Sequence, residues 1–95
     1  MIILPRNDLK KQEILSKIAK KFIKDKEYPE QEVNEIIKSF DVEDYVLFRR
    51  ELVNFNYLGK DSYKNIYWLK KDSLSEEELD KIRGNQEKME KGNVY

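Results

Sequence analysis

The part of the chain that decides its fold reads YPEQEVNEIIKSFDVEDYVLFRRELVNFNYLGKDSYKNIYWL, residues 28–69. Near its start, apolar residues recur at positions i, i+3, i+4 and i+7, the spacing that places them on one face of a helix. These residues are Val33, Ile36, Ile37 and Phe40. A second face at helical spacing follows, made of Tyr45, Phe48, Leu52 and Phe55, with Val53 at its flank. The stretch therefore predicts two consecutive amphipathic helices.

A few residues mark the predicted ends of these helices. Pro29 suits the first turn of the earlier helix, where its missing N–H costs no helical hydrogen bond. Asp41 is the predicted cap of the later helix, with Asp44 three residues on in a capping-box-like arrangement. Asn56 is the predicted end of that helix, because asparagine tolerates the left-handed conformation common at this place.

The end of the stretch predicts a β-hairpin. Residues 57–60 and 66–70 are short runs of strand-forming residues, and the turn formers of residues 61–65 separate them. Because a lone hairpin is only marginally stable in water, we expect it to pack on the helices. The residues with the area to do so are Tyr67, Trp68 and Leu69.

Helices are also predicted on both sides of this stretch. The first begins near Asn7 or Asp8 and closes at residues 25–27. Its apolar face consists of Ile14, Leu15, Ile18, Phe22 and Ile23. Ser75 and Glu78 match a capping box that starts a last helix. The apolar stripe of that helix is thin and consists of Leu79, Ile82 and Met89.

The order of these elements predicts an α+β fold that is winged-helix-like, with three helices, a β-hairpin wing and a C-terminal helix. A chain of 95 residues has room for one small domain. We expect that domain over residues 1–71, followed by the C-terminal helix and a frayed tail over residues 72–95. Such an architecture presents a helix and a wing to a partner and carries no chemistry of its own.

The composition argues against an enzyme. The chain has no histidine and no cysteine, which removes the usual zinc, copper and iron ligand sets and any Ser-His-Asp or Cys-His site. Its 3 glycines are too few and too scattered for a phosphate-cradling or dinucleotide-binding loop. Paired carboxylates such as Glu30 with Glu35 lie where helix capping or solvation explains them. We therefore expect no enzymatic activity and no cofactor.

The sequence also carries no sign of a membrane segment. The absence of cysteine fits a cytoplasmic protein. Residues 1–5 are too short for a signal-peptide core, and no apolar run approaches the roughly 20 residues that span a bilayer. We expect a soluble, cytoplasmic protein with no membrane partner.

Charge alternates along the chain, although 19 basic and 19 acidic residues balance overall. Residues 1–27 hold 8 basic and 4 acidic residues, and residues 28–56 hold 3 and 7. Residues 57–71 hold 4 and 1, and residues 72–95 hold 4 and 7. This alternation favours complementarity within the protein or with a partner over a uniformly basic nucleic-acid binder.

Several motifs resemble a small prokaryotic domain family of unassigned function, found alone or attached to helix-turn-helix transcriptional regulators. The family pattern is Tyr-(Ser/Thr)-Glu-x-Glu-Val-Asn, then Arg-Arg-x-Leu-Val, then a glycine, a leucine, a basic residue and a tyrosine. The matching residues, over roughly residues 9–70, are Tyr28, Glu30, Glu32, Val33, Asn34, Arg49, Arg50, Leu52, Val53, Leu58, Lys60 and Tyr67. Pro29 replaces the hydroxyl residue, and Asn56 replaces the glycine. The resemblance implies a winged-helix-like module associated with transcription, and it implies no ligand or catalytic residue.

Arg49 and Arg50 are the first candidate binding residues. Either they contact phosphates from a recognition helix, or one pairs with an acid of the preceding helix while the other covers apolar surface. The acids available for such a pair are Glu30, Glu32 and Glu35. The second interpretation is favoured, because acids occupy the helix end that would enter a major groove. Those acids are Asp41, Glu43 and Asp44.

The wing supplies the remaining candidates, which are Lys60, Lys64, Lys70 and Lys71, accompanied by Tyr63 and Trp68. Basic and aromatic side chains together are typical of nucleic-acid surfaces. We expect Trp68 in the core, with a stacking platform as the alternative. Asn34 is expected to bond to the loop that follows its helix, with a partner contact as the alternative.

Two functions therefore stay open. One is a transcription-associated module that binds DNA through the wing lysines and Arg49 and Arg50. The other is a protein-interaction or regulatory module of the same fold that does not bind DNA. Charge segregation favours the second and the family context with the wing favours the first, which we adopt as the broad expectation. The C-terminal helix either forms a homodimer, or packs on its own chain or stays a loose tail.

Overall fold

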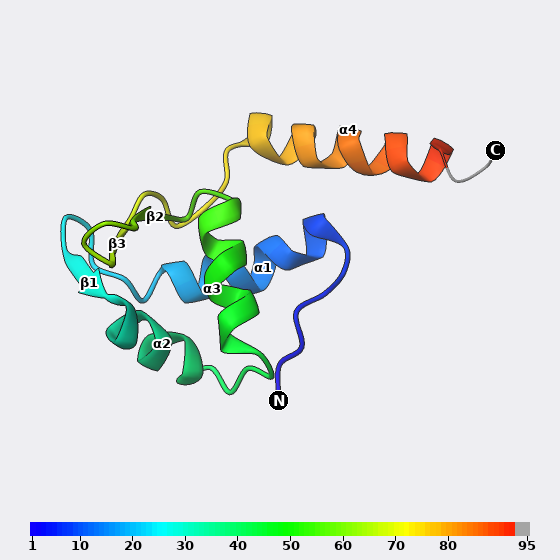
Figure 1. Ribbon diagram of the computed structural model, residues 1–95. Helices are drawn as coiled ribbons and strands as arrows, with labels where there is room; N and C mark the ends of the chain where they lie inside the picture. Colours follow the sequence, from blue (N-terminus) through cyan, green and yellow to red (C-terminus); the bar gives the residue numbers. More distant parts are fainter. Residues whose placement is uncertain (93–95) are drawn as a thin grey trace.

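In the computed structural model, three strands lie together at one end of three helices, and a fourth helix extends away from them (Figure 1). The structure describes residues 1–92, with side chains for residues 1–84. The elements are α1 (Asp8–Ala19), β1 (Glu27–Pro29), α2 (Glu30–Lys38), α3 (Tyr45–Asn54), β2 (Leu58–Asp61), β3 (Ile66–Leu69) and α4 (Glu76–Gly92). The expected α+β class is confirmed.

The first helix is shorter than predicted. Asn7 caps α1 as expected, since its Oδ1 atom accepts from the backbone N–H of Leu9 at 2.9 Å. The helix ends at Ala19, and Asp25 in the following loop has a φ of 64°. Phe22 is still buried, whereas Ile23, predicted on the same face, is 62% exposed. The α1 face therefore ends before the loop that leads to β1.

The sheet has one strand more than the predicted hairpin. Strand β1 pairs antiparallel with β3, and β3 pairs antiparallel with β2, so that the strand order is β1-β3-β2. Pro29 ends β1 and precedes α2, where the prediction placed it inside the helix. A proline is tolerated here because β1 is an edge strand and its last residue needs no ladder N–H. Alternating exposure over only three residues gave too weak a pattern to predict the strand.

The boundaries of α3 were predicted correctly at one end only. Asp44, and not Asp41, caps the helix, because its Oδ1 atom accepts from the N–H of Leu47 at 3.1 Å. Asp41 instead adopts a φ of 53° in the preceding loop. At the other end Asn56 has the predicted left-handed φ, 64°. The N–H of Tyr57 bonds to the carbonyl of Leu52 there, which is the longer bond of a Schellman motif.

The core lies between the helices and the inner face of the sheet. The fully buried side chains come from α1, α2, α3 and the strands, and the largest are Tyr28, Tyr57, Tyr67, Phe48, Leu15 and Ile18. Inside it, the hydroxyl of Tyr57 donates to Oε1 of buried Gln12 at 2.8 Å. Burial raises the pKa of Tyr57 to about 12. One buried polar pair thus links α1 to the start of the hairpin.

Candidate functional site

Arg49 points into the protein and joins three elements. Its Nη1 atom donates to Oδ1 of Asn34 at 2.6 Å, and its Nε atom lies 3.6 Å from Oε1 of Glu30. The hydroxyl of Tyr67 donates to the same Glu30 oxygen at 2.8 Å. Only 16% of the Arg49 side chain is exposed. The residues Glu30, Asn34, Arg49 and Tyr67 therefore form an internal polar network between α2, α3 and β3, which we call the α2–α3 network.

This network also sets the charge state of Glu30. The hydrogen bond from Tyr67 holds the pKa of Glu30 below its usual value, and the positive charges of Arg49 and Lys60 act in the same direction. The Nζ atom of Lys60 lies 5.4 Å from the centre of the Tyr67 ring. Burial and the hydrogen bond to Glu30 raise the pKa of Tyr67. The network is therefore stable with Glu30 ionised and Tyr67 neutral.

The network bears on two of the predicted alternatives. One arginine of the pair does bind an acid of the preceding helix, and that arginine is Arg49. Asn34 bonds to Arg49 of α3, where the prediction had it bond to the loop after its own helix. The difference arises because Asn34 and Arg49 face each other across the packed pair of helices, α2 and α3.

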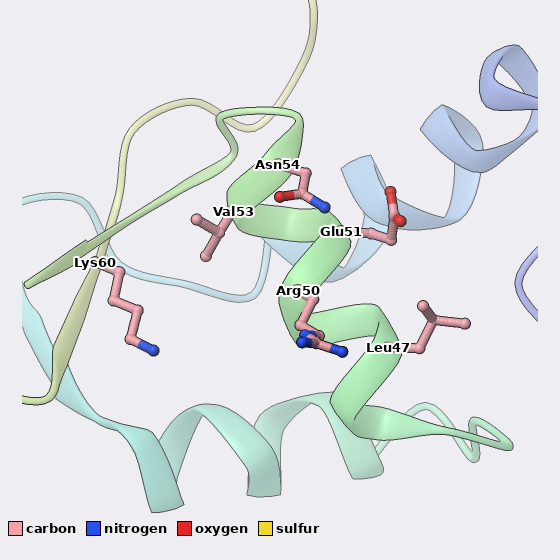
Figure 2. Close-up of a pocket in the computed structure, with 6 residues that line it drawn as sticks. All are labelled: Leu47, Arg50, Glu51, Val53, Asn54 and Lys60. Carbon is pink, nitrogen blue, oxygen red and sulfur yellow. The ribbon is translucent and has the colours of Figure 1, made fainter. Parts of the chain in front are cut away.

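Arg50, the next residue, lies about 100° further around α3 and is exposed. Figure 2 shows it at the mouth of a groove between α3 and β2, with Lys60 reaching in from the strand. The groove has a volume of about 380 Å³ and is lined by Leu47, Arg50, Glu51, Val53, Asn54 and Lys60. Glu51 is directed toward α1, where its Oε2 atom lies 3.7 Å from Nζ of Lys11. We call this the α3 groove, and its two cations come from different elements.

The other predicted cations lie elsewhere. Lys64 is exposed at the tip of the hairpin, whereas Lys70 follows the far end of β3, with its Nζ atom 3.5 Å from Oδ1 of Asn56. Lys71 forms an ion pair with Glu78 in the first turn of α4. The six predicted residues therefore do not form one face. In the α3 groove the structure brings together two of them, Arg50 and Lys60.

The N-terminal end of α3 is acidic and partly apolar at its surface. Asp41, Glu43 and Asp44 are all exposed, and a carboxylate oxygen of Asp41 lies 3.4 Å from the amino group of Met1. On the first turn of α3, Val46 is 36% exposed and Leu47 is 39% exposed. This end of the helix therefore differs in charge from the α3 groove.

Sequence reasoning missed the apolar and amide parts of the α3 groove. Leu47, Arg50 and Asn54 follow at i, i+3 and i+7, which places them on one face opposite the buried Phe48 and Leu52. That spacing was readable from the sequence. The contribution of Lys60 was not, because it depends on how β2 packs against α3.

Trp68 is not in the core, and the prediction that it packs on the helices was wrong. Tyr67 and Leu69 face the helices, whereas Trp68 is partly buried on the outer face of the sheet. The register pairs it with Gly59 on one side and Glu27 on the other. A Cβ atom at Gly59 would overlap the indole, so the ring lies against bare backbone.

α4 contacts α1, and Leu79 and Ile82 near its start are partly buried. The predicted capping box is present, with the N–H of Glu78 donating to Oγ of Ser75 at 3.2 Å. Met89 lies outside the described side chains, and homodimerisation through α4 stays a prediction. Among the described residues, no helix is both long and apolar enough to cross a membrane.

Comparison with known proteins places the chain in a family. The profile of an uncharacterized protein family conserved in bacteria (DUF2087) matches residues 1–69. No curated protein and no solved structure matches the chain. The expected resemblance to a prokaryotic family of unassigned function is thereby supported, because the match spans most of the chain. On this evidence the chain belongs to the uncharacterized family conserved in bacteria (DUF2087).

Proposed function

We propose that the chain is a non-enzymatic, winged-helix-like module associated with transcription, and that it binds the DNA backbone through the α3 groove and the hairpin. The order of the elements up to β3 supports the winged-helix-like part, together with the sheet order β1-β3-β2. β2 of the hairpin contacts α3, which fits a hairpin that acts as a wing. The resemblance of the sequence motifs to a family attached to helix-turn-helix regulators supports the association with transcription.

The observation that carries the proposal is the meeting of Arg50 and Lys60 in one exposed groove. The described side chains include no acid within salt-bridge distance of either cation. Arg50 is available to phosphate oxygens, and Lys60, whose charge also acts on Glu30, adds a second positive charge to the groove. Lys64 at the hairpin tip adds a third cation on the wing. Leu47 and Asn54 beside Arg50 are of the types that contact the thymine methyl group and adenine in base readout.

The acids at the start of α3 limit how a duplex could lie on this surface. In many helix-turn-helix proteins the N-terminal residues of the recognition helix contact the base edges. Here Glu43 and Asp44 occupy that end, and their carboxylates would repel phosphates. The proposed contact therefore uses the middle and the C-terminal half of α3 together with the hairpin.

A second function is favoured by a different observation. Val46 and Leu47 expose apolar surface beside the acidic end of α3, and exposed apolar residues rimmed by charges are typical of protein-binding surfaces. The alternative is a protein-interaction or regulatory module that uses this surface and does not bind DNA. A change of Val46 to Ser, which lies outside the α3 groove, would weaken binding of such a partner and leave phosphate binding nearly unchanged.

The test is binding of a fluorescent random-sequence duplex, measured by anisotropy at about 50 mM and about 200 mM salt. We expect binding at the lower concentration and a steep loss at the higher, because each neutralised phosphate releases counterions. The double variant Arg50→Glu, Lys60→Glu should lose binding at both concentrations.

The matched control is the double variant Lys20→Glu, Lys24→Glu, which makes the same change of net charge at exposed residues of α1 and its loop. It should retain most of the affinity. Absence of binding at the lower salt concentration would reject the DNA proposal and leave the protein-interaction module. Equal losses in both double variants would show that net charge alone, and not the α3 groove, determines binding.

A further inference from the structure

A second hollow, separate from the α3 groove, lies where β1 begins and β3 ends. Its volume is about 390 Å³, and it is lined by Asp25, Lys26, Glu27, Trp68 and Leu69. Trp68 and Lys60 lie on opposite faces of the sheet, since Lys60 is in register with inward-facing Tyr67. The two hollows share no lining residue, and the proposed function leaves this one unexplained.

The indole of Trp68 is held in place as a flat surface. Gly59 lies in register with it on β2, and the missing side chain there leaves room for the ring against the backbone. Glu27 is its register partner on β1, and side chains of directly opposed antiparallel residues have Cβ atoms about 5 Å apart. The register thus places Glu27 beside the indole on the same face of the sheet.

The charges around the hollow favour a cation. The ammonium group of Lys26 is occupied, because its Nζ atom lies 3.5 Å from Oε1 of Glu32 and 4.7 Å from the centre of the Tyr28 ring. Asp25 and Glu27 are exposed, and neither forms an ion pair with any residue whose side chain the structure describes. The hollow therefore offers two carboxylates beside an indole, with the nearby lysine already neutralised.

We propose that this hollow binds the guanidinium group of an arginine from a protein partner, stacked on Trp68 and hydrogen-bonded to Glu27. Arginine fits better than lysine, since its planar group stacks on a ring while its N–H fork meets a carboxylate. A quaternary ammonium ion fits less well, because such ions are recognised by cages of several aromatic rings. The hollow has one ring, and that ring lies beside an acid.

Trp68 is the single tryptophan of the chain, so its indole N–H signal reports on the hollow without overlap from other tryptophans. The probe is the tripeptide acetyl-Gly-Arg-Gly-amide, titrated into the ¹⁵N-labelled full chain while the indole N–H resonance is followed. A single stacked and paired side chain binds weakly, so we expect a Kd of about 1 mM or above. The same tripeptide with lysine in place of arginine should bind more weakly. The version with glutamate should leave the chemical shift of the indole N–H unchanged.

Two variants locate the interaction. Glu27→Gln should weaken the arginine tripeptide by about twofold to fivefold, the range of an exposed ion pair. Glu35→Gln, which removes an exposed carboxylate of α2 on another surface, is the matched control and should bind as the wild type does. Both changes are at exposed positions, so the fold should persist, and the backbone spectrum checks this.

Three results would overturn the proposal. Equal shifts with the arginine and glutamate tripeptides would show non-specific contact with the indole. Equal affinities for arginine and lysine would show general attraction of cations without stacking. An unchanged affinity of Glu27→Gln for the arginine tripeptide would show that the Glu27 carboxylate does not bind the guanidinium group. None of these results depends on DNA binding, which the duplex experiment measures at the other face of the sheet.

Discussion

Arg49 and Arg50 are neighbours in the sequence, yet they belong to two regions with opposite roles. Arg49 is tied into the α2–α3 network by Asn34 and Glu30, whereas Arg50 is exposed at the α3 groove. One residue along a helix turns the side chain by about 100° around the axis, since a turn takes about 3.6 residues. The comparison teaches that a double-arginine motif can combine a structural residue with a candidate binding residue.

The largest expected effect comes from removing the structural member of the pair. Arg49→Ala deletes a charge-assisted hydrogen bond to Asn34 and leaves partly buried Glu30 without its ion-pair partner. We expect the free energy of unfolding to fall by about 1–3 kcal/mol. Urea denaturation followed by circular dichroism measures this. If Arg49→Ala lost no more stability than Arg50→Ala, the two arginines would not differ in their structural role.

The next effect in size comes from the strand side of the network. Tyr67→Phe removes the hydroxyl that donates to Glu30 and leaves the ring in the core. The expected loss of stability is about 0.5–1.5 kcal/mol, because one hydrogen bond is lost and no cavity forms. Combining this change with Arg49→Ala in a double-mutant cycle tests the coupling, since both residues contact Oε1 of Glu30. Additive losses would show that the two contacts are independent.

A smaller effect is expected from titration of the network. The pKa of Glu30 is lowered in the folded protein, so its contribution to stability is present above the pKa of an unfolded glutamate and is lost as the pH falls through the folded value. Stability should therefore decline below about pH 4.3. Glu30→Gln, compared with Glu35→Gln as the control, should show a shallower decline in urea midpoints between neutral and acidic pH. Identical profiles for the two variants would exclude Glu30 as a contributor.

The smallest effect on stability should come from Arg50. Arg50→Ala changes an exposed side chain outside the network, and we expect a change within about 0.5 kcal/mol. Its effect on binding of the fluorescent duplex should be larger than its effect on folding. If Arg50→Ala clearly lowered the free energy of unfolding and bound the duplex as the wild type does, the roles assigned to the two arginines would be reversed.

Much of the fold could be predicted from the sequence, because helix faces and caps are local signals. The faces of α2 and α3 and the caps at Asn7, Ser75 and Asn56 were readable in this way. Strand β1 was not, since three residues give little pattern and the pairing with β3 is long-range. The same limit applies to Trp68, because strand alternation places it on one face without saying which face meets the helices.

The candidate site was predictable only in part. The sequence singled out the six basic residues, and it offered the pairing of one arginine with an acid of α2 as an interpretation. It left open which arginine pairs, although helical spacing places Arg49 at the edge of the apolar face of α3 and Arg50 on the side away from it. Nor could it show that α4 engages Lys71, because that contact depends on how the linker folds back.

Pro29 has a consequence for how this sheet could grow. It ends edge strand β1 after three residues and offers no N–H to a further strand. Within the three-stranded sheet this leaves β2 as the edge at which another chain could add by backbone pairing. Addition of a strand from another chain is therefore restricted to the β2 edge. There the charged side chain of Lys60 disfavours such pairing.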